Sequence, residues 1–273
     1  MTWMRAVATL GLLLSTGCAF LPGIERHSAE HVDLAPPDRP ARTFHYGLYL
    51  PRDYDAPENA QKRWPLLVYL PGCWSHGDHL EIPGRTGLIR ELENGRELPM
   101  VVVTPMTPAL LEKWSPRDFV AFLDHTEERF RVDPDRVYVT GVSLSGAALW
   151  ETAKAYPDRI AAIAPVAGWG DPEGVERMVE VPVWAFHGAL DFMVPSPRHH
   201  RMVEALERAG GHARWTLLSG GFHGIWNRVY AMDALYDWLL AQTRHGRDPA
   251  EAGDGIELAP RPDPGATGVA RAR

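Results

Sequence analysis

Cysteine is scarce in this chain, because its 273 residues include only Cys18 and Cys73. So few cysteines exclude a fold held by several disulfides, and stability has to come from a hydrophobic core. The chain also lacks an internal repeat and a glycine motif for binding a dinucleotide or phosphate, so no cofactor is expected. It has no basic cluster, and its net charge of −7 gives no general electrostatic attraction to nucleic acid or to an anionic membrane.

The length and the hydrophobic content of 45% suffice for one sizeable α/β domain or two small ones. No linker divides the middle of the chain, and we expect a single folded domain over residues 42–245. Residues 18–41 are rich in proline and charge and are expected to form a tether before it. Residues 246–273 contain almost no large apolar side chain and are expected to be disordered.

The first residues are typical of an export signal. Residues 1–17 hold one early positive charge and an apolar run that is short for a transmembrane helix. The four residues Ser15 to Cys18 resemble a bacterial lipobox, in which Cys18 would be lipidated and become the mature N-terminus. We expect an exported lipoprotein of the bacterial periplasm or outer membrane, attached through this lipid. The alternative is an ordinary signal that is cleaved nearby and releases a secreted protein.

Short apolar runs alternate with segments of helical periodicity along the domain. The runs predict buried strands at residues 43–51, 65–71, 100–105, 136–140, 181–187 and 213–218, with one more inside residues 156–168. Helices are expected at residues 86–93, 116–130, 147–155, 200–209 and 226–240, the second of them with Ser115 as its N-cap. This alternation predicts a mostly parallel central sheet with helices on both faces.

One turn between a strand and a helix carries a candidate nucleophile. The strand of residues 136–140 and the helix of residues 147–155 leave residues 141–145 to turn between them. A serine in such a turn has a strained backbone and an Oγ that stands clear of the sheet. The helix N-terminus behind it favours developing negative charge.

Ser143 is the better candidate of the two serines in this turn. Strand and helix pass closely there, so the residues two before and two after the nucleophile have to be small. Gly141 and Ser145 meet this requirement for Ser143, although the usual G-x-S-x-G pattern has a second glycine. Ser145 has Ser143 and Ala147 at the same two positions and is the poorer nucleophile.

A serine hydroxyl also needs a base to take its proton and a third group to orient that base. Asp191 follows the apolar run of residues 181–187, and His223 follows the last predicted strand between glycines. The order Ser143, Asp191, His223 is that of α/β-hydrolases. Asp191 could instead cap a helix or pair with Arg198, and His223 could be a surface histidine. His187 is the rival base, for which a structural hydrogen-bonding role is expected.

Five segments resemble the α/β-hydrolase superfamily, namely residues 70–74, 138–146, 156–165, 187–191 and 221–223. Within it, the chain resembles exported serine esterases related to polyhydroxybutyrate depolymerases, feruloyl and acetylxylan esterases and predicted peptidases. The similarity covers residues 43–242 and is more specific for the superfamily than for a substrate. It implies the α/β-hydrolase fold and cleavage of carboxylic esters through an acyl-enzyme.

The resemblance also implies roles for individual residues. Ser143 would be the nucleophile, His223 the base and acid, and Asp191 its orienting partner. The oxyanion hole would use the backbone N–H groups of Leu144 and Cys73.

Two residues depart from the family pattern. Pro71 stands where histidine is usual, and Ser145 stands where glycine is usual. Pro71 puts the support of the oxyanion loop in doubt, and the Ser145 hydroxyl must find room and a partner.

Further candidates lie in the loops that follow the strands. Four tryptophans are expected to line the substrate site, because ligands bind at this edge of α/β sheets: Trp74, Trp114, Trp169 and Trp226. His76, Asp78 and His79 offer three potential metal ligands, but no further ligand follows at an expected spacing, so a polar loop is the preferred interpretation. No metal is expected.

The sequence therefore predicts a serine hydrolase of carboxylic esters, such as a carboxylesterase, a feruloyl or acetyl esterase, or a polyester depolymerase. One alternative is a serine peptidase on the same fold, because both reactions use the same residues. Another is a catalytically silent surface-binding lipoprotein.

Overall fold

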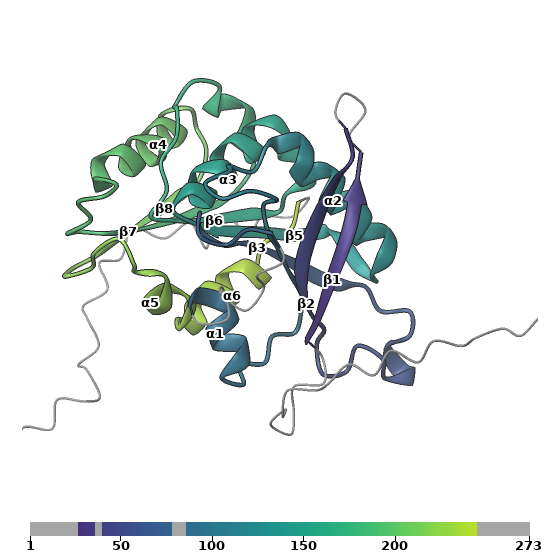
Figure 1. Ribbon diagram of the computed structural model, residues 1–273. Coiled ribbons are helices and arrows are strands. Elements are labelled where there is room, and N and C mark those ends of the chain that lie inside the picture. Colours follow the sequence, from purple (N-terminus) through teal and green to yellow (C-terminus); the bar gives the residue numbers. More distant parts are fainter. Residues whose placement is uncertain (1–26, 36–39, 78–85, 245–273) are drawn as a thin grey trace, which may run out of the picture.

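The computed structural model describes residues 27–35, 40–77 and 86–244 (Figure 1). The expected export signal, Cys18 and the expected tail of residues 246–273 lie outside this part of the chain. None of the helices in the described ranges combines the length and apolar character that crossing a membrane requires.

An eight-stranded sheet in the order β1-β2-β4-β3-β5-β6-β7-β8 forms the centre of the molecule. The strand β1 pairs antiparallel with β2, and β2 pairs antiparallel with β4, whereas all other pairs are parallel. The mostly parallel sheet is thus confirmed. The strands are β1 (His27–Leu34), β2 (Arg42–Tyr49), β3 (Trp64–Leu70), β4 (Val101–Pro105), β5 (Val132–Val142), β6 (Ala162–Val166), β7 (Val183–Gly188) and β8 (Ala213–Leu218).

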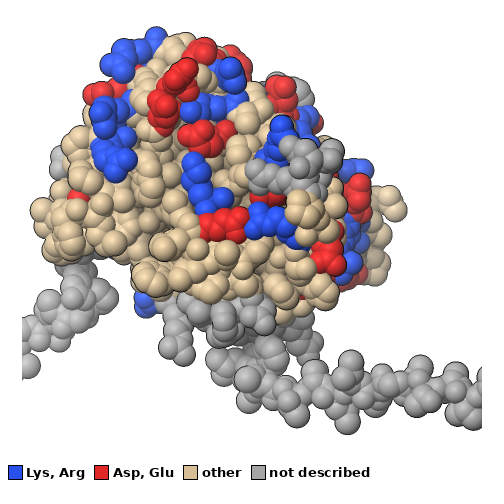
Figure 2. Space-filling model, turned by 45° about the horizontal axis from the view of Figure 1, so that its top comes forward, with Lys and Arg blue, Asp and Glu red and all other residues tan. Residues whose placement is uncertain are grey.

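Helices cover both faces of this sheet, as the continuous apolar runs of its inner strands require. Every residue of β3 and β4 is buried. One apolar cluster packs between the sheet and α2 (Pro116–Arg129), α3 (Leu144–Ala155) and α4 (Ser196–Arg208), and a second packs against α1 (Gly87–Glu93), α5 (Trp226–Tyr230) and α6 (Asp233–Leu240). Figure 1 shows the two helical layers above and below the sheet. On the upper layer, Lys and Arg are interspersed with Asp and Glu (Figure 2).

Two sequence expectations about these elements need correction. The predicted tether of residues 18–41 is wrong for residues 27–34, which form β1 and lengthen the sheet by an edge strand. The predicted helix of residues 226–240 is two helices, because Met232 has extended backbone dihedrals and interrupts it. The Tyr236 hydroxyl donates a hydrogen bond of 2.7 Å to the Tyr230 carbonyl at this break. By contrast, the predicted N-cap is confirmed, since Ser115 Oγ accepts a hydrogen bond from Asp118 N–H.

Candidate active site

The turn between β5 and α3 holds Ser143 in a conformation that few L-amino acids adopt. Its φ is 56° and its ψ is −119°, which is the strained geometry expected of an exposed nucleophile. Backbone hydrogen bonds fix it on both sides: Ser143 N–H donates to Val166 O at 2.9 Å, and Ala147 N–H donates to Ser143 O at 2.9 Å.

Close backbone approach makes this turn possible. A Cβ on Gly141 would lie 2.9 Å from Leu149 Cδ1, as expected of a required small residue. The closest approach on the helix side is at Gly146, where a Cβ would lie 2.8 Å from Val166 O. Gly168 lies against it, because a Cβ there would be 2.7 Å from the Gly146 carbonyl carbon. The sequence predicts small residues at Gly141 and Ser145, and the contact at Gly141 agrees with this. It does not predict the close approach of Gly146 and Gly168.

The loops after β7 and β8 bring Asp191 and His223 together. Gly188 ends β7, and a Cβ on it would lie only 2.3 Å from Phe222 O and 2.5 Å from Gly221 O. Leu190 N–H also donates to Gly221 O at 2.8 Å. A glycine at this strand end is therefore what allows the histidine loop to pack onto the aspartate loop.

Ser143, His223 and Asp191 form a continuous chain of hydrogen bonds. His223 Nδ1 lies 2.7 Å from Asp191 Oδ2, and His223 Nε2 lies 2.8 Å from Ser143 Oγ. An ionised carboxylate only accepts hydrogen bonds, so Nδ1 carries the imidazole proton and Nε2 accepts from the serine hydroxyl. The Asp191 side chain is fully buried and that of His223 is 13% exposed. The three predicted residues thus lie within hydrogen-bonding distance of one another, in the order Asp191, His223, Ser143.

Groups other than His223 also hold the Asp191 carboxylate. Its Oδ1 accepts from Met193 N–H at 3.0 Å and from Val194 N–H at 2.9 Å. Its Oδ2 also lies 3.1 Å from His187 Nε2. These contacts fix the orientation of the carboxylate. Arg198, the alternative partner that the sequence offers for Asp191, lies over the ring of Trp169 instead.

His187 belongs to a buried pair of histidines behind Asp191. Its Nε2 lies 2.8 Å from Val194 O, a pure acceptor, so this nitrogen carries the proton. Its Nδ1 then accepts from His199 Nδ1–H at 3.0 Å. Burial lowers the pKa of His187 and, more strongly, that of His199, so both rings are neutral. His187 therefore supports the carboxylate by hydrogen bonding and does not serve as a second base for Ser143.

The predicted oxyanion donors flank Ser143. Leu144 is the first residue of α3, where a backbone N–H has no partner within the helix. Cys73 follows Gly72, at which a Cβ would lie 4.0 Å from Ser143 Cβ. A turn closes with the hydrogen bond from Ser75 N–H to Gly72 O at 3.0 Å, and this bond does not use the Cys73 N–H. Both amides thus belong to segments that lie beside Ser143.

The two departures from the family pattern meet in space. Ser145 Oγ donates a hydrogen bond of 2.5 Å to Pro71 O, and both residues are buried. This bond joins the first turn of α3 to the loop that carries Cys73. The Pro71 carbonyl therefore accepts the hydrogen bond that the Ser145 hydroxyl needs, and Ser145 in turn supports the loop that begins at Pro71.

Replacing Ser145 by alanine is expected to lower kcat for a soluble ester about tenfold with little change in KM. The loss of one buried hydrogen bond, worth about 1.4 kcal/mol, would loosen the loop beside the reacting carbonyl. Steady-state kinetics would measure it. Thr152→Val is the matched control, because Thr152 Oγ1 is buried on the same helix without a hydrogen-bond partner among the described residues. Equal rates for Ser145→Ala and the wild type would contradict the positioning role.

Three of the four predicted tryptophans lie near solvent at the strand ends. Trp74 is exposed, Trp169 is half-buried, and Trp226 packs edge-on against His223 with ring centroids 5.7 Å apart. The prediction for Trp114 is wrong. Its side chain is buried in the core, because it packs between Phe44 of β2, on which it stacks at 5.1 Å, and Phe122 of α2, which it meets edge-on at 6.2 Å.

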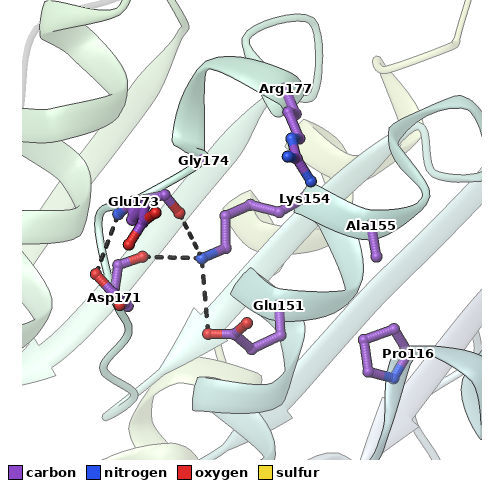
Figure 3. A pocket seen from close by; sticks show the side chains of 8 residues that line it. All are labelled: Pro116, Glu151, Lys154, Ala155, Asp171, Glu173, Gly174 and Arg177. Carbon is purple, nitrogen blue, oxygen red and sulfur yellow. Dashed lines mark hydrogen bonds and ion pairs between the residues drawn. The ribbon is translucent and has the colours of Figure 1, made fainter.

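A hollow of about 370 Å³ lies at the other end of α3. Lys154 is eleven residues after Ser143, which corresponds to about 16 Å along a helix axis. Figure 3 shows Lys154 reaching the loop of residues 171–173, where its Nζ donates to Asp171 O and Glu173 O at 2.9 Å each. Glu151 takes a third contact at 3.7 Å. The donor capacity of Lys154 is therefore used within the protein, and this hollow is separate from Ser143.

No group of three or more metal-binding side chains occurs within residues 27–35, 40–77 and 86–244. Asp78 and His79 lie outside these ranges, so the interpretation of their loop stays a prediction.

Solved structures similar to this chain include several hydrolases. A thermostable esterase matches with a TM-score of 0.69 and 24% identity over 81% of this chain, which spans 64% of the length of that esterase. A CE1 ferulic acid esterase from the anaerobic fungus Anaeromyces mucronatus matches with a TM-score of 0.56 and 18% identity over 82% of this chain and 93% of its own. An acylaminoacyl peptidase from Pyrococcus horikoshii matches with a TM-score of 0.59 and 10% identity over 82% of this chain and 43% of its own. These similarities show the fold.

No curated protein matches the chain significantly. The model of the dienelactone hydrolase family matches residues 100–237, just over half of the 273 residues. The matched region includes the turn with Ser143 and the loops with Asp191 and His223. The resemblance to α/β-hydrolases is therefore confirmed, and the chain belongs to the dienelactone hydrolase family.

Proposed function

We propose that this hydrolase cleaves carboxylic esters with Ser143 as its nucleophile. The observation that carries the proposal is the chain of hydrogen bonds from Asp191 through His223 to Ser143. The partners of His223 fix its tautomer, so the nitrogen that faces Ser143 is the one able to accept a proton. Burial of the carboxylate and the strained turn at Ser143 support the same assignment.

In the first half of the reaction, His223 takes the proton of Ser143 while Oγ attacks the ester carbonyl carbon. The negative charge that develops on the carbonyl oxygen is stabilised by the N–H groups of Leu144 and Cys73. His223 then gives its proton to the alcohol oxygen as the bond from carbon to this oxygen breaks, which leaves an acyl group on Ser143. In the second half, His223 takes a proton from water and the hydroxyl adds to the acyl carbon. The bond from this carbon to Ser143 Oγ then breaks as His223 returns the proton to Oγ, and the carboxylic acid leaves.

The proposal also assigns roles to the tryptophans near Ser143 and to the N-terminal segment. Trp74, Trp169 and Trp226 are proposed to contact the acyl or alcohol part of the substrate. We also propose export of the protein and its attachment to a membrane through a lipid on Cys18, for which residues 1–18 are the support.

The test compares two substrates that share an acetyl group and differ in one atom of the leaving group, p-nitrophenyl acetate and p-nitroacetanilide. The ester is expected to be hydrolysed with saturation kinetics and the anilide at a far lower rate. A fluorophosphonate should stop turnover and add its phosphonyl mass to the peptide that contains Ser143. Preferential cleavage of the anilide would indicate a peptidase instead. Absence of both turnover and labelling would contradict any serine hydrolase.

A further inference from the structure

A histidine occupies a position of α4 where the helical pattern favours an apolar side chain. The buried residues of this helix are His199, Met202, Val203, Ala205 and Leu206, which share one face. His199 is fully buried, and α4 packs on β7 and β8, above which it lies in Figure 1. Burying a polar ring here costs free energy that an apolar side chain would avoid.

One nitrogen of His199 has a hydrogen-bond partner and the other has none in the part of the chain that the structure describes. Its Nδ1 lies 3.0 Å from His187 Nδ1, whereas its Nε2 is buried and unpaired there. Two neutral imidazoles share such a contact only if one nitrogen carries a proton and the other does not. Because the Val194 carbonyl fixes the His187 proton on Nε2, His199 donates from Nδ1. The single hydrogen bond of His199 therefore goes to the ring that lies behind Asp191.

Two tryptophan rings hold the ring of His199 in place. The centroids lie 5.9 Å apart for Trp150 and 5.4 Å apart for Trp215, and both tryptophans stand nearly perpendicular to the histidine. Trp150 belongs to α3, which begins next to Ser143, and Trp215 belongs to β8, which precedes the loop with His223. His199 is thus enclosed by two elements that carry residues of the triad, and its donor has a fixed direction.

His187 reaches both oxygens of the Asp191 carboxylate. Its Nε2 lies 3.1 Å from Oδ2, which is also the atom that accepts from His223 Nδ1 at 2.7 Å. The same Nε2 lies 2.8 Å from the carbonyl oxygen of Val194, and Val194 N–H donates to Oδ1 at 2.9 Å. A rotation of the His187 ring would therefore disturb the carboxylate on which the orientation of His223 depends.

We propose that His199 is a positioning residue, which acts through His187 to hold the Asp191 carboxylate against His223. This inference rests on the proposed esterase function and adds a residue to its site. Without the bond from His199, the His187 ring keeps only the contacts of its Nε2 and is free to tilt. Because His199 is fully buried, it cannot touch a substrate, so its loss should lower kcat and leave KM nearly unchanged.

The test compares His199→Leu with His199→Asn, two side chains of nearly equal size and shape. The asparagine amide places a donor close to the position of Nδ1, whereas leucine has no donor. With p-nitrophenyl acetate, His199→Leu is expected to lower kcat about tenfold, and His199→Asn is expected to stay within about twofold of the wild type. His200→Leu is the matched control, because it changes the next residue of α4, whose side chain is 43% exposed, and it should leave kcat unchanged.

A double-mutant cycle tests whether the effect passes through His187. His187→Leu removes the intermediate ring, so adding His199→Leu to it should lower kcat by less than about twofold more. Proton NMR gives a second readout, because an imidazole N–H that is strongly bonded to a carboxylate resonates far downfield. The signal of His223 Nδ1–H should be sharp in the wild type and in His199→Asn, and broadened or shifted upfield in His199→Leu.

Three results would overturn the proposal. These are equal losses of kcat in His199→Leu and His199→Asn, additive effects of the two leucine changes, and an unchanged His223 signal in His199→Leu. Thermal unfolding shows which variants are folded, and if His199→Leu is not, His199→Phe supplies a buried ring without a donor and carries the same expectations. The NMR signal requires no substrate, so it tests the positioning role even if the wild type fails to hydrolyse p-nitrophenyl acetate, a failure that would contradict the esterase proposal alone.

Discussion

Replacing Ser143 by alanine should lower kcat for p-nitrophenyl acetate by roughly 10³ to 10⁶, because removal of a triad nucleophile leaves only the contributions of binding and the oxyanion hole. Alanine has the same Cβ as serine, so the backbone strain at a φ of 56° is nearly unchanged. The hydrogen bonds of the Ser143 N–H and C=O groups involve main-chain atoms and remain available. The variant should therefore fold like the wild type, and the loss should lie in the chemical step.

Steady-state kinetics and thermal unfolding measured side by side would separate chemistry from folding. Ser145→Ala is the matched control, since it removes a hydroxyl two residues away and is expected to cost only about one order of magnitude. The fluorophosphonate should label the control protein and fail to label Ser143→Ala. A Ser143→Ala protein that keeps more than a tenth of wild-type activity would remove Ser143 from the mechanism.

The triad could be predicted because each of its members has a local signature. The turn at Ser143 shows itself in small residues between an apolar strand and a helix, and Asp191 and His223 each follow an apolar run. In a parallel sheet the ends of such runs meet at one edge whatever their separation in sequence. The strand order does not need to be known for this argument, and that is why the sequence could predict that these three residues lie together.

The contacts that support the triad had no such signature. The pairing of Ser145 with Pro71 joins positions that are 74 residues apart, and each looks like an isolated departure in the sequence. The contact between His187 and Asp191 depends on how a five-residue segment turns after β7. Hydrogen bonds of this kind follow from tertiary packing, which residue types alone do not determine.

The sequence was misleading where a local pattern was weak or ambiguous. The segment that forms β1 is mostly polar, because an edge strand with one exposed side needs few apolar residues, and its composition therefore predicts a tether. Trp114 follows a strand just as Trp74 does, but only the structure shows that Phe44 and α2 enclose it.

The second large effect is expected for Asp191→Asn, which should lower kcat by roughly 10⁴ through the tautomer of His223. Asparagine has the shape of aspartate, but one of its two terminal atoms donates hydrogen bonds. The Oδ1 position accepts from the N–H groups of Met193 and Val194, which cannot change their protonation. The amide oxygen must therefore occupy this position, and the NH₂ group must face His223.

An NH₂ group there forces His223 to accept a hydrogen bond at Nδ1, so the imidazole proton moves to Nε2. The nitrogen that faces Ser143 then donates and cannot take the serine proton. Nitrogen NMR of the imidazole would report the change of tautomer, and kinetics would report its effect on kcat. Asp237→Asn makes the same chemical change at an exposed position of α6 and should alter neither. If Asp191→Asn costs less than tenfold while His223 changes tautomer, general base catalysis by His223 is not the source of the rate. Nε2 would then carry a proton and could not take the proton of Ser143.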